Sequence, residues 1–116
     1  MPPPNLIERP GRQGQLYILL RDQNGRLLGG LIADTYWGWL DVDDFWLDET
    51  ARGRGLGGMM LVAAEKEAIA RGCRHAKLET FSFQARGFYE KCGYRVVGQL
   101  DEYPPAGSFY WMRKDF

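Results

Sequence analysis

A glycine-rich stretch, "ARGRGLGG" at residues 51–58, constrains the fold of this 116-residue chain more than any other feature. Four of the six residues from 53 to 58 are glycine, and such a segment loses much backbone entropy when it becomes ordered. Glycines let several backbone N–H groups face one point, and a following helix adds its unpaired N–H groups and the positive end of its dipole. The stretch therefore predicts a phosphate-binding loop at the start of a helix.

A helix is predicted directly after these glycines from the spacing of apolar residues. They recur at offsets 0, 3, 4, 7 and 8, which lie on one helical face: Leu56, Met59, Met60, Ala63 and Ala64. Glu65, Lys66 and Glu67 are expected to face solvent, and Gly72 is a natural end for the helix. The glycines and this helix therefore form one continuous loop–helix segment.

Two apolar runs of strand length precede this segment. The first is "QLYILLRD" at Gln15–Asp22, and the second, "RLLGGLIADTY", follows the hairpin-turn signal Asn24-Gly25. The pair Gly29-Gly30 inside the second run indicates a bulge or a close approach of other backbone. We expect these runs to form two antiparallel strands.

A third strand is expected at Gly38–Leu47, antiparallel to the second after a tight turn. Leu40 and Val42 alternate with Asp41 and Asp43, as in a half-buried strand. The alternation breaks over the next four residues, "DFWL", and a bulge would explain the break. The first half of the domain is thus three consecutive antiparallel strands.

The rest of the chain predicts one more helix among three strands. "CRHAKLETF" is a strand, Ser82 can cap a short helix that runs to about Cys92, and Gly93 stops that helix. "YRVVGQLDEY" and "SFYWMRKDF" are two closing strands joined by "PPAG". The order β-β-β-α-β-α-β-β predicts an α+β domain with a single mixed, mostly antiparallel sheet and two helices.

Charge and apolar content exclude several classes of protein. Lys plus Arg and Asp plus Glu both number 15, so the chain is a poor candidate for binding nucleic acid or a membrane surface. No apolar run approaches a membrane span, and the N-terminus lacks the apolar core of a signal peptide. We expect a flexible lead-in at residues 1–14, one domain at 15–116 and a reduced, cytoplasmic setting. Cys73 and Cys92 match no metal spacing, although a disulfide between them stays open.

One hypothesis for the loop is a dinucleotide-binding site. Gly53, Gly55 and Gly58 spell G-x-G-x-x-G, and Glu79 follows about 20 residues later, where a ribose-binding acid would lie. However, "DETAR" separates the glycines from the preceding strand, and a dinucleotide fold is built from parallel βαβ units rather than from hairpins. A dinucleotide-binding module is therefore an alternative that the rest of the pattern disfavours.

A second pattern in the same letters is Arg52-x-x-Gly55-x-Gly57, and later segments extend it. "DDFWLDETARGRGLGGMMLVAAEKEAIARGC", "KLETF" and "ARGFYEKCGYRVV" follow in order over residues 42–97. Together they resemble the GNAT superfamily of acyl-CoA-dependent N-acetyltransferases. Members carry Arg/Gln-x-x-Gly-x-Gly/Ala before a helix and Ala-x-x-Phe-Tyr-x-x-x-Gly-Phe/Tyr later. The resemblance implies transfer of an acetyl group from acetyl-CoA to a primary amine by direct attack, with no metal.

The resemblance also implies a set of cofactor contacts. In the family, backbone amides of the glycine loop hold the CoA pyrophosphate, and the end of the preceding strand pairs with the pantetheine arm. The matching residues are Phe45, Trp46, Leu47, Arg52, Gly53, Arg54, Gly55, Leu56, Gly57, Gly58, Ser82 and Tyr89. Ser82 stands where the family usually has an Asn that hydrogen-bonds the pantetheine arm.

Catalytic roles are implied in the same way. Tyr89 matches the tyrosine that protonates the departing CoA thiolate in many GNAT enzymes, and a phenol pKa of about 10 suits a thiol pKa of about 8.5. A base is needed because an amine with a pKa of about 10.4 is mostly ammonium at neutral pH. Asp41 and Asp43 are the candidates that we favour, with Asp44 and Glu79 as further ones.

Other aspects of the function stay open at this point. Family members usually open with a strand and two helices, and too few residues precede Gln15 to supply them. We therefore expect a short form whose acceptor slot is open or is closed by a second subunit in a homodimer. The acceptor is a small-molecule or peptide amine that the sequence does not identify. A module that binds acyl-CoA without turnover is the alternative function.

Overall fold

The computed structural model describes residues 6–8 and 14–116. Leu6–Glu8 forms a short strand, β1, which pairs antiparallel with β2 (Gln15–Arg21). We expected no strand before Gln15, because a run of three residues is too short to show a period. The rest of the predicted flexible lead-in lies outside the described residues.

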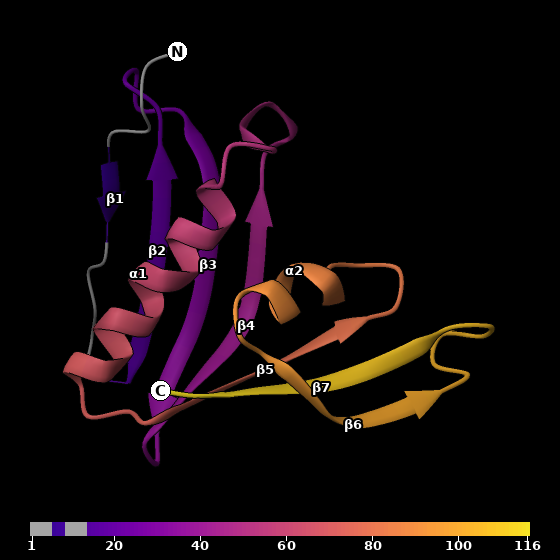
Figure 1. The fold of residues 1–116 in the computed structure, drawn as a ribbon. Helices are drawn as coiled ribbons and strands as arrows, with labels where there is room; N and C mark the ends of the chain where they lie inside the picture. Colours follow the sequence, from indigo (N-terminus) through magenta and orange to yellow (C-terminus); the bar gives the residue numbers. More distant parts are fainter. Residues whose placement is uncertain (1–5, 9–13) are drawn as a thin grey trace.

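Two helices and a short 3₁₀ helix accompany the strands of this part of the chain (Figure 1). After β2 the elements are β3 (Leu27–Tyr36), β4 (Trp39–Leu47), η1 (Glu49–Ala51), α1 (Leu56–Ala70), β5 (His75–Phe81), α2 (Arg86–Lys91), β6 (Arg95–Asp101) and β7 (Ser108–Asp115). From β2 onward this is the predicted order, so the predicted α+β fold is confirmed. No helix of the described residues is long and apolar enough to cross a membrane.

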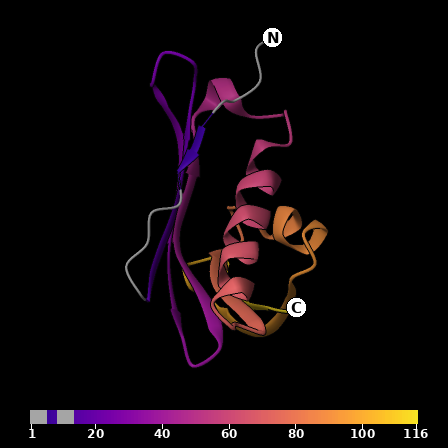
Figure 2. The same ribbon diagram turned by 90° about the vertical axis from the view of Figure 1, so that its left-hand side faces the viewer.

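The strands form one mixed sheet with the order β1-β2-β3-β4-β5-β7-β6. Strands β4 and β5 are parallel, because α1 carries the chain back along the sheet between them, and the other pairs are antiparallel. Figure 2 shows β1 to β4 nearly edge-on, with α1 and α2 on the same side of the sheet. The opposite face of the sheet carries no helix from the described part of the chain.

Helix α1 buries a wider face than its apolar spacing predicts. Met59, which we placed on the buried face, is 38% exposed, whereas Leu61 is fully buried. Glu65, expected in solvent, is also buried. The reason is that α1 packs on the sheet and also touches side chains near the C-terminus. The core between helix and sheet contains Leu16, Ile18, Leu20, Leu31, Leu40, Met60, Leu61, Leu78 and Met112.

The end of α1 is the one predicted from Gly72. This glycine has a φ of +92°, in the left-handed region. Its N–H donates to the Ile69 carbonyl at 2.9 Å, and the Cys73 N–H donates to the Ala68 carbonyl at 2.9 Å. These two bonds make a Schellman motif, which satisfies carbonyls that the helix end leaves unpaired.

The Gly29-Gly30 pair marks a close approach to the end of β4. A Cβ on Gly29 would lie 2.9 Å from the Leu47 Cδ1 and 3.0 Å from the Trp46 carbonyl oxygen. A Cβ on Gly30 would lie 2.8 Å from the Trp46 Nε1. The two glycines therefore let the last residues of β4 lie close against β3. Of the two alternatives expected for this pair, a bulge or a close approach of other backbone, the structure shows the close approach.

Helix α2 begins four residues later than Ser82, so the predicted cap is wrong. Ala85 is its N-cap, and its side chain cannot accept a hydrogen bond. Ser82 instead exchanges two hydrogen bonds with Ser108, its N–H to the Ser108 carbonyl at 2.8 Å and the Ser108 N–H to its Oγ at 3.0 Å. This exchange extends the β5–β7 pairing and keeps Ser82 out of the helix. Cys73 and Cys92 are free thiols.

Candidate active site

A gap opens between β4 and β5 in the middle of the sheet. The two strands pair from Trp39–His75 to Asp41–Lys77 and then diverge, as Figure 1 shows. On its other side β4 stays paired with β3 as far as Leu47. The backbone groups of β4 that face β5 beyond Asp41 therefore have no strand beside them. An extended molecule can pair with this edge as an added strand would.

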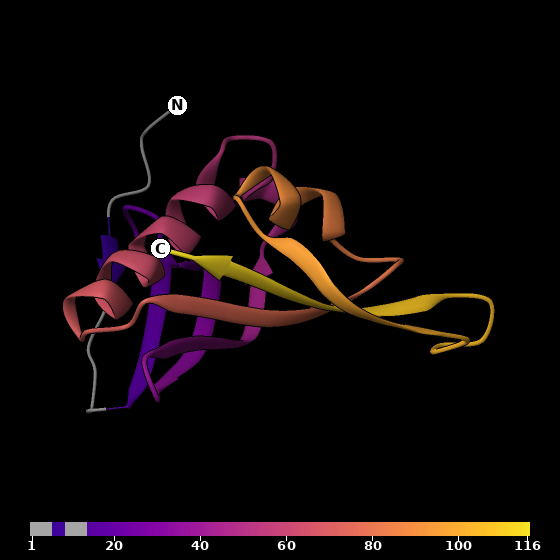
Figure 3. The same ribbon diagram turned by 60° about the horizontal axis from the view of Figure 1, so that its bottom comes forward.

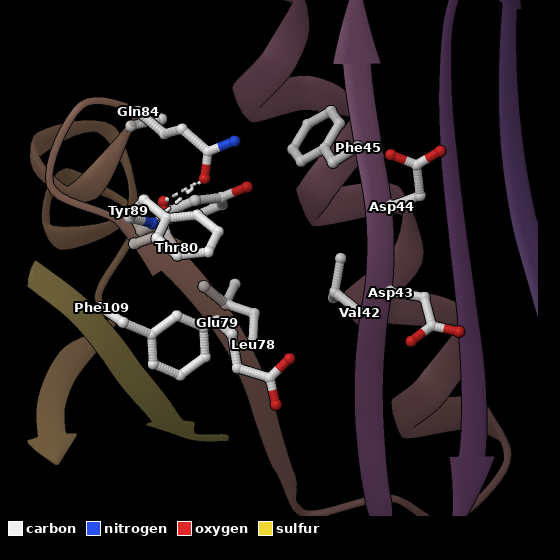
Figure 4. Close-up of a pocket in the computed structure, with 12 residues that line it drawn as sticks. Val42, Asp43, Asp44, Phe45, Leu78, Glu79, Thr80, Gln84, Tyr89 and Phe109 are labelled. Carbon is white, nitrogen blue, oxygen red and sulfur yellow. Dashed lines mark hydrogen bonds between the residues drawn. The ribbon is translucent and has the colours of Figure 1, made fainter. Parts of the chain in front are cut away.

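A β-bulge lies where the strands part. Ile32 pairs with Asp44 and Ala33 pairs with Val42, so Asp43 is the extra residue of β4. A bulge bends its strand and increases the local twist, which turns β4 away from β5. We expected the bulge in the segment "DFWL", and the structure places it one residue earlier. Because the extra residue resets the alternation, Asp43 and Asp44 are both exposed and lie on the β3 side of β4 in Figure 4.

An acidic pocket of about 330 Å³ lies in the gap between β4 and β5. Its walls come from β4, β5, the β5–α2 loop, α2 and β7 (Figure 4). The lining residues are Val42, Asp43, Asp44, Phe45, Leu78, Glu79, Thr80, Phe81, Gln84, Ala85, Tyr89 and Phe109. Three of them are carboxylates and none is Lys or Arg, so the pocket favours a cationic ligand.

An apolar pocket of about 260 Å³ lies beside it, between the end of β4, the start of α1 and α2. Its lining residues are Phe45, Trp46, Leu47, Arg52, Gly57, Ala85, Phe88 and Tyr89. The Phe88 ring packs against the start of α1, where a Cβ on Gly57 would make an ordinary contact with its Cζ at 3.4 Å. The two pockets share Phe45, Ala85 and Tyr89, and they therefore meet around these three side chains.

Tyr89 is the titratable residue common to both pockets. It is only 9% exposed, and burial raises the pKa of its phenol, with Cys92 and the Asp44 carboxylate raising it further. Within the described residues, no side chain or backbone group holds its hydroxyl in a hydrogen bond. The phenol is therefore protonated at neutral pH, and its proton is available to a group bound in either pocket.

The end of α2 fixes the position of Tyr89. Gly93, with a φ of +96°, ends the helix as predicted, and the Tyr94 N–H donates to the Tyr89 carbonyl at 3.0 Å. The rings of Tyr89 and Tyr94 also contact each other, with centroids 6.1 Å apart. A contact of this kind commonly accompanies a Schellman motif. The Gly93-Tyr94 pair of the sequence motif thus serves to place Tyr89.

A buried polar network lies behind this pair of tyrosines. The Tyr94 hydroxyl donates to the Glu65 Oε2 at 2.8 Å, and the Lys114 Nζ lies 2.9 Å from the Glu65 Oε1. Burial and the Glu65 carboxylate raise the pKa of Tyr94 well above its usual range, so its hydroxyl remains a donor. No signal in the sequence indicates this network, because its members come from α1, the end of α2 and β7.

The four candidate bases differ in their surroundings. Asp41 lies outside the acidic pocket, where its carboxylate accepts from the Tyr36 hydroxyl at 2.7 Å and pairs with the Lys77 Nζ at 3.1 Å. Asp43, Asp44 and Glu79 line the pocket. In Figure 4 the Glu79 carboxyl group reaches into the gap between β4 and β5. Asp43 thus lines the pocket with its side chain on the β3 side of β4, whereas Asp41 does not line it.

The glycine loop connects η1 to α1. Gly53 and Gly55 have φ angles of +75° and +73°, and Gly55 is the N-cap of the helix, which begins at Leu56 as predicted. A Cβ added to Gly53, Gly55 or Gly58 would meet no atom within 4 Å. The first N–H groups of α1 are therefore approachable by a phosphate, which the helix dipole favours.

The predicted cofactor residues fall into three groups. Six line the apolar pocket: Phe45, Trp46, Leu47, Arg52, Gly57 and Tyr89. Five lie around the first turn of α1: Gly53, Arg54, Gly55, Leu56 and Gly58. Ser82 lies outside the lining of both pockets, and its hydroxyl is engaged by Ser108. Within the first group the Arg52 Nε donates to the Leu47 carbonyl at 3.1 Å, which links the segment before α1 to the end of β4.

Other kinds of site find less support. Among residues 6–8 and 14–116, no group of three or more His, Cys, Asp and Glu is arranged to hold a metal ion. The G-x-G-x-x-G spelling lies in a single parallel βαβ unit, β4–α1–β5, but η1 separates its glycines from β4 and antiparallel hairpins precede it, unlike the repeated parallel units of a dinucleotide fold. A sheet that splays beside a strand–glycine loop–helix segment instead defines an acyl-CoA-binding type of fold, as the sequence motifs predict.

Comparison with known proteins identifies this class. The model of the acetyltransferase (GNAT) family matches residues 2–94, which is most of the chain. The chain therefore belongs to the GNAT family and is a GNAT-type N-acetyltransferase. Blasticidin-S acetyltransferase of Streptomyces morookaense is 40% identical over 94 residues, which are 80% of this chain and 69% of that protein.

Solved structures agree with this assignment. An acetyltransferase from Bacillus cereus matches with a TM-score of 0.85 and 33% identity, over 88% of this chain and 73% of that one. A Bacillus anthracis protein assigned as a streptothricin acetyltransferase, solved in complex with acetyl coenzyme A, matches with a TM-score of 0.80 over 91% of this chain and 65% of that one. At 19% identity the second likeness shows the fold alone.

Proposed function

We propose that this chain transfers an acetyl group from acetyl-CoA to a primary amine by direct attack of the amine on the thioester. The observation that carries the proposal is the place of Tyr89, a protonated phenol in the wall shared by the acidic and apolar pockets. The acidic pocket suits a cationic amine, and the apolar pocket suits the thioester end of the pantetheine arm.

The residues present fit acetyl-CoA in three respects. The edge of β4 at Phe45–Leu47 faces the gap, where its backbone groups can pair with the amides of the pantetheine arm. The apolar pocket can hold the methylene groups of the arm. The open glycines Gly53, Gly55 and Gly58 and the first N–H groups of α1 can hold the pyrophosphate. When bound, acetyl-CoA supplies the acetyl group on a thioester.

The acidic pocket supplies the proton acceptor. A carboxylate there attracts the ammonium form of the acceptor and removes its proton, directly or through a water molecule. We assign this role to Glu79, whose carboxyl group reaches into the gap, with Asp43 as the second candidate because its side chain lies on the β3 side of β4, and we leave Asp41 at the β4–β5 junction with Lys77. As the C–N bond forms and the C–S bond breaks, Tyr89 gives its proton to the sulfur and later regains one from solvent.

Replacement of Tyr89 by Phe tests the acid role. The ring and its packing remain, so kcat should fall roughly 10- to 100-fold, at the low end for a general acid because a thiolate leaves readily. Tyr94→Phe is the matched control, because it removes the hydroxyl of the neighbouring ring, and its kcat should stay within about threefold. Thiol release measures both. An unchanged kcat in Tyr89→Phe would refute the assignment.

Replacement of Gly55 by Glu tests the loop. It places bulk and negative charge at a φ of +73° beside the proposed pyrophosphate site, so CoA should no longer bind in a calorimetric titration. Gly38→Glu is the control, because Gly38 has a φ of +78° in the β3–β4 turn, at the opposite end of the sheet from the start of α1. It should bind CoA as the wild type does. Full CoA binding by Gly55→Glu would remove the loop from the site.

An acceptor screen decides between an enzyme and a binding module. Blasticidin S, for which the 40% identical relative is named, is the first amine to test, followed by polyamines, amino acids and peptides. Release of CoA thiol with one of these acceptors would support the proposed transfer. Tight binding of acetyl-CoA with no thiol release across the screen would instead favour the non-catalytic module.

A further inference from the structure

A cluster of exposed aromatic rings borders the acidic pocket. We call this cluster the aromatic platform, and it consists of Phe81, Phe83, Tyr103, Phe109 and Trp111. Its rings contact one another with centroids 4.8 to 5.8 Å apart. Phe83, Tyr103 and Trp111 are 69%, 52% and 41% exposed. A contiguous exposed patch of this kind commonly marks a binding surface.

The platform continues the pocket on the face of the sheet that the helices leave open. Tyr110 points to α2, because the Arg86 guanidinium lies over its ring at 4.6 Å. Its neighbours Phe109 and Trp111 therefore point to the opposite face. Phe81 pairs across the strands with Phe109, and both residues also line the acidic pocket, where Figure 4 labels Phe109. The pocket and the platform are thus one continuous surface.

Hydrogen bonds at the base of the platform order the backbone on both sides of its rings. Ser82 and Ser108 join the end of β5 to the start of β7, as described above. The turn between β6 and β7 is closed by the Glu102 N–H, which donates to the Gly107 carbonyl at 3.0 Å. Figure 3 shows this hairpin extending beyond α2. A surface that is already ordered loses little conformational entropy when a ligand binds.

We infer that the acceptor is a cationic amine carrying a planar ring, with the ring stacked on the aromatic platform. The inference rests on the proposed function, because it extends the acceptor pocket of that reaction. Charge complementarity selects the occupant: the ammonium group enters the pocket beside the Glu79 carboxylate, which reaches into the gap, and the flat apolar part meets the exposed rings. A symmetric contact between two copies would bring their acidic pockets together, which like charges disfavour.

The amines 2-phenylethylamine and n-butylamine carry equal charge, and only the first has a planar ring. A comparison of their KM values therefore tests whether the enzyme binds the ring of the acceptor. KM for 2-phenylethylamine should be about tenfold lower than KM for n-butylamine. Phe83→Ala and Tyr103→Ala should raise KM for 2-phenylethylamine roughly three- to tenfold and leave KM for n-butylamine and Kd for CoA within about twofold. Phe83→Tyr keeps a ring and should keep the wild-type KM. Equal changes for both amines, or none, would overturn the inference.

Direct binding separates this inference from the proposed function. In an NMR titration without acetyl-CoA, 2-phenylethylamine should shift the ring resonances of Phe83 and Tyr103. Shifts without any acetylated amine would support the platform and refute the reaction. Acetylation without such shifts would support the reaction and overturn the platform. A dimer in sedimentation velocity that Phe83→Ala converts to a monomer would also overturn it, by assigning this surface to a second copy.

Discussion

The buried hydrogen bond between Tyr94 and Glu65 gives the sharpest test of the structure behind the catalytic tyrosine. Tyr94→Phe removes one oxygen atom and keeps the ring that contacts Tyr89. It also keeps the backbone N–H that donates to the Tyr89 carbonyl. The Glu65 carboxylate then retains Lys114 as its partner but loses the hydroxyl. The variant therefore separates the hydrogen bond from the packing.

The size of the effect follows from the burial of both groups. Tyr94 is 3% exposed and Glu65 is 6% exposed, so water cannot replace the lost donor. A hydrogen bond to a charged group contributes about 1.5–3 kcal/mol. A domain of this length loses about 4 °C in Tm for each kcal/mol. We therefore expect Tyr94→Phe to lower Tm by about 6–12 °C.

Urea unfolding and calorimetry measure this change directly. Tyr103→Phe is the matched control, because Tyr103 is 52% exposed and the loss of its hydroxyl should change the free energy of unfolding by less than about 0.5 kcal/mol. Activity of Tyr94→Phe adds a second readout, since its kcat should change by less than about threefold while the ring of residue 94 stays in place. A Tm within about 2 °C of the wild type would show that the Tyr94–Glu65 bond does not hold this region together.

Three further predictions concern other parts of the domain. Gly29→Ala should destabilise the domain by about 1–3 kcal/mol in urea unfolding, because its Cβ would lie 3.0 Å from the Trp46 carbonyl, whereas Gly58→Ala, with open space around it, should not. The raised pKa of Tyr89 means that its proton is lost only as pH rises above about 10, so kcat should show no alkaline decline below that pH; a decline centred near pH 8 that Tyr89→Phe abolishes would contradict this. The His75 and Arg113 side chains hold the pKa of Asp115 down to about 2, so the stabilisation exists above its usual pKa of about 3.9 and is lost as pH falls toward 2. Asp115→Asn should therefore lower the urea midpoint at about pH 7 and leave it unchanged at about pH 2.

Local chemistry explains why much of the fold could be predicted from the sequence. The start of α1 at Leu56 and its end just before Gly72 depend on glycines in left-handed conformations and on apolar spacing within one helix. The β2–β3 hairpin depends on the Asn24-Gly25 turn signal. The motif around Tyr89 depends on the short helix α2 and the glycine that ends it. Each of these features needs only a few adjacent residues, so the amino-acid order is sufficient to reveal it.

The failed expectations involve residues whose partners are distant in the chain. Ser82 does not cap α2, because Ser108, 26 residues later, takes its hydroxyl. Glu65 is buried rather than solvated, because Tyr94 and Lys114 meet it from 29 and 49 residues away. Helical spacing describes one face of α1, and it carries no information on what packs against the other side.

The acidic residues show where amino-acid order ends and three-dimensional packing begins. Their spacing placed Asp41 and Asp43 on one face of a regular strand and left both as candidates. In the folded sheet the bulge at Asp43 shifts the alternation, and the β4–β5 pairing ends at Asp41. Short sequence motifs were thus sufficient to predict the glycine loop, the two helices and the family. Which carboxylates line the pocket depends on how two strands diverge, because that distance is set by contacts among β3, β4 and β5 rather than within any one of them.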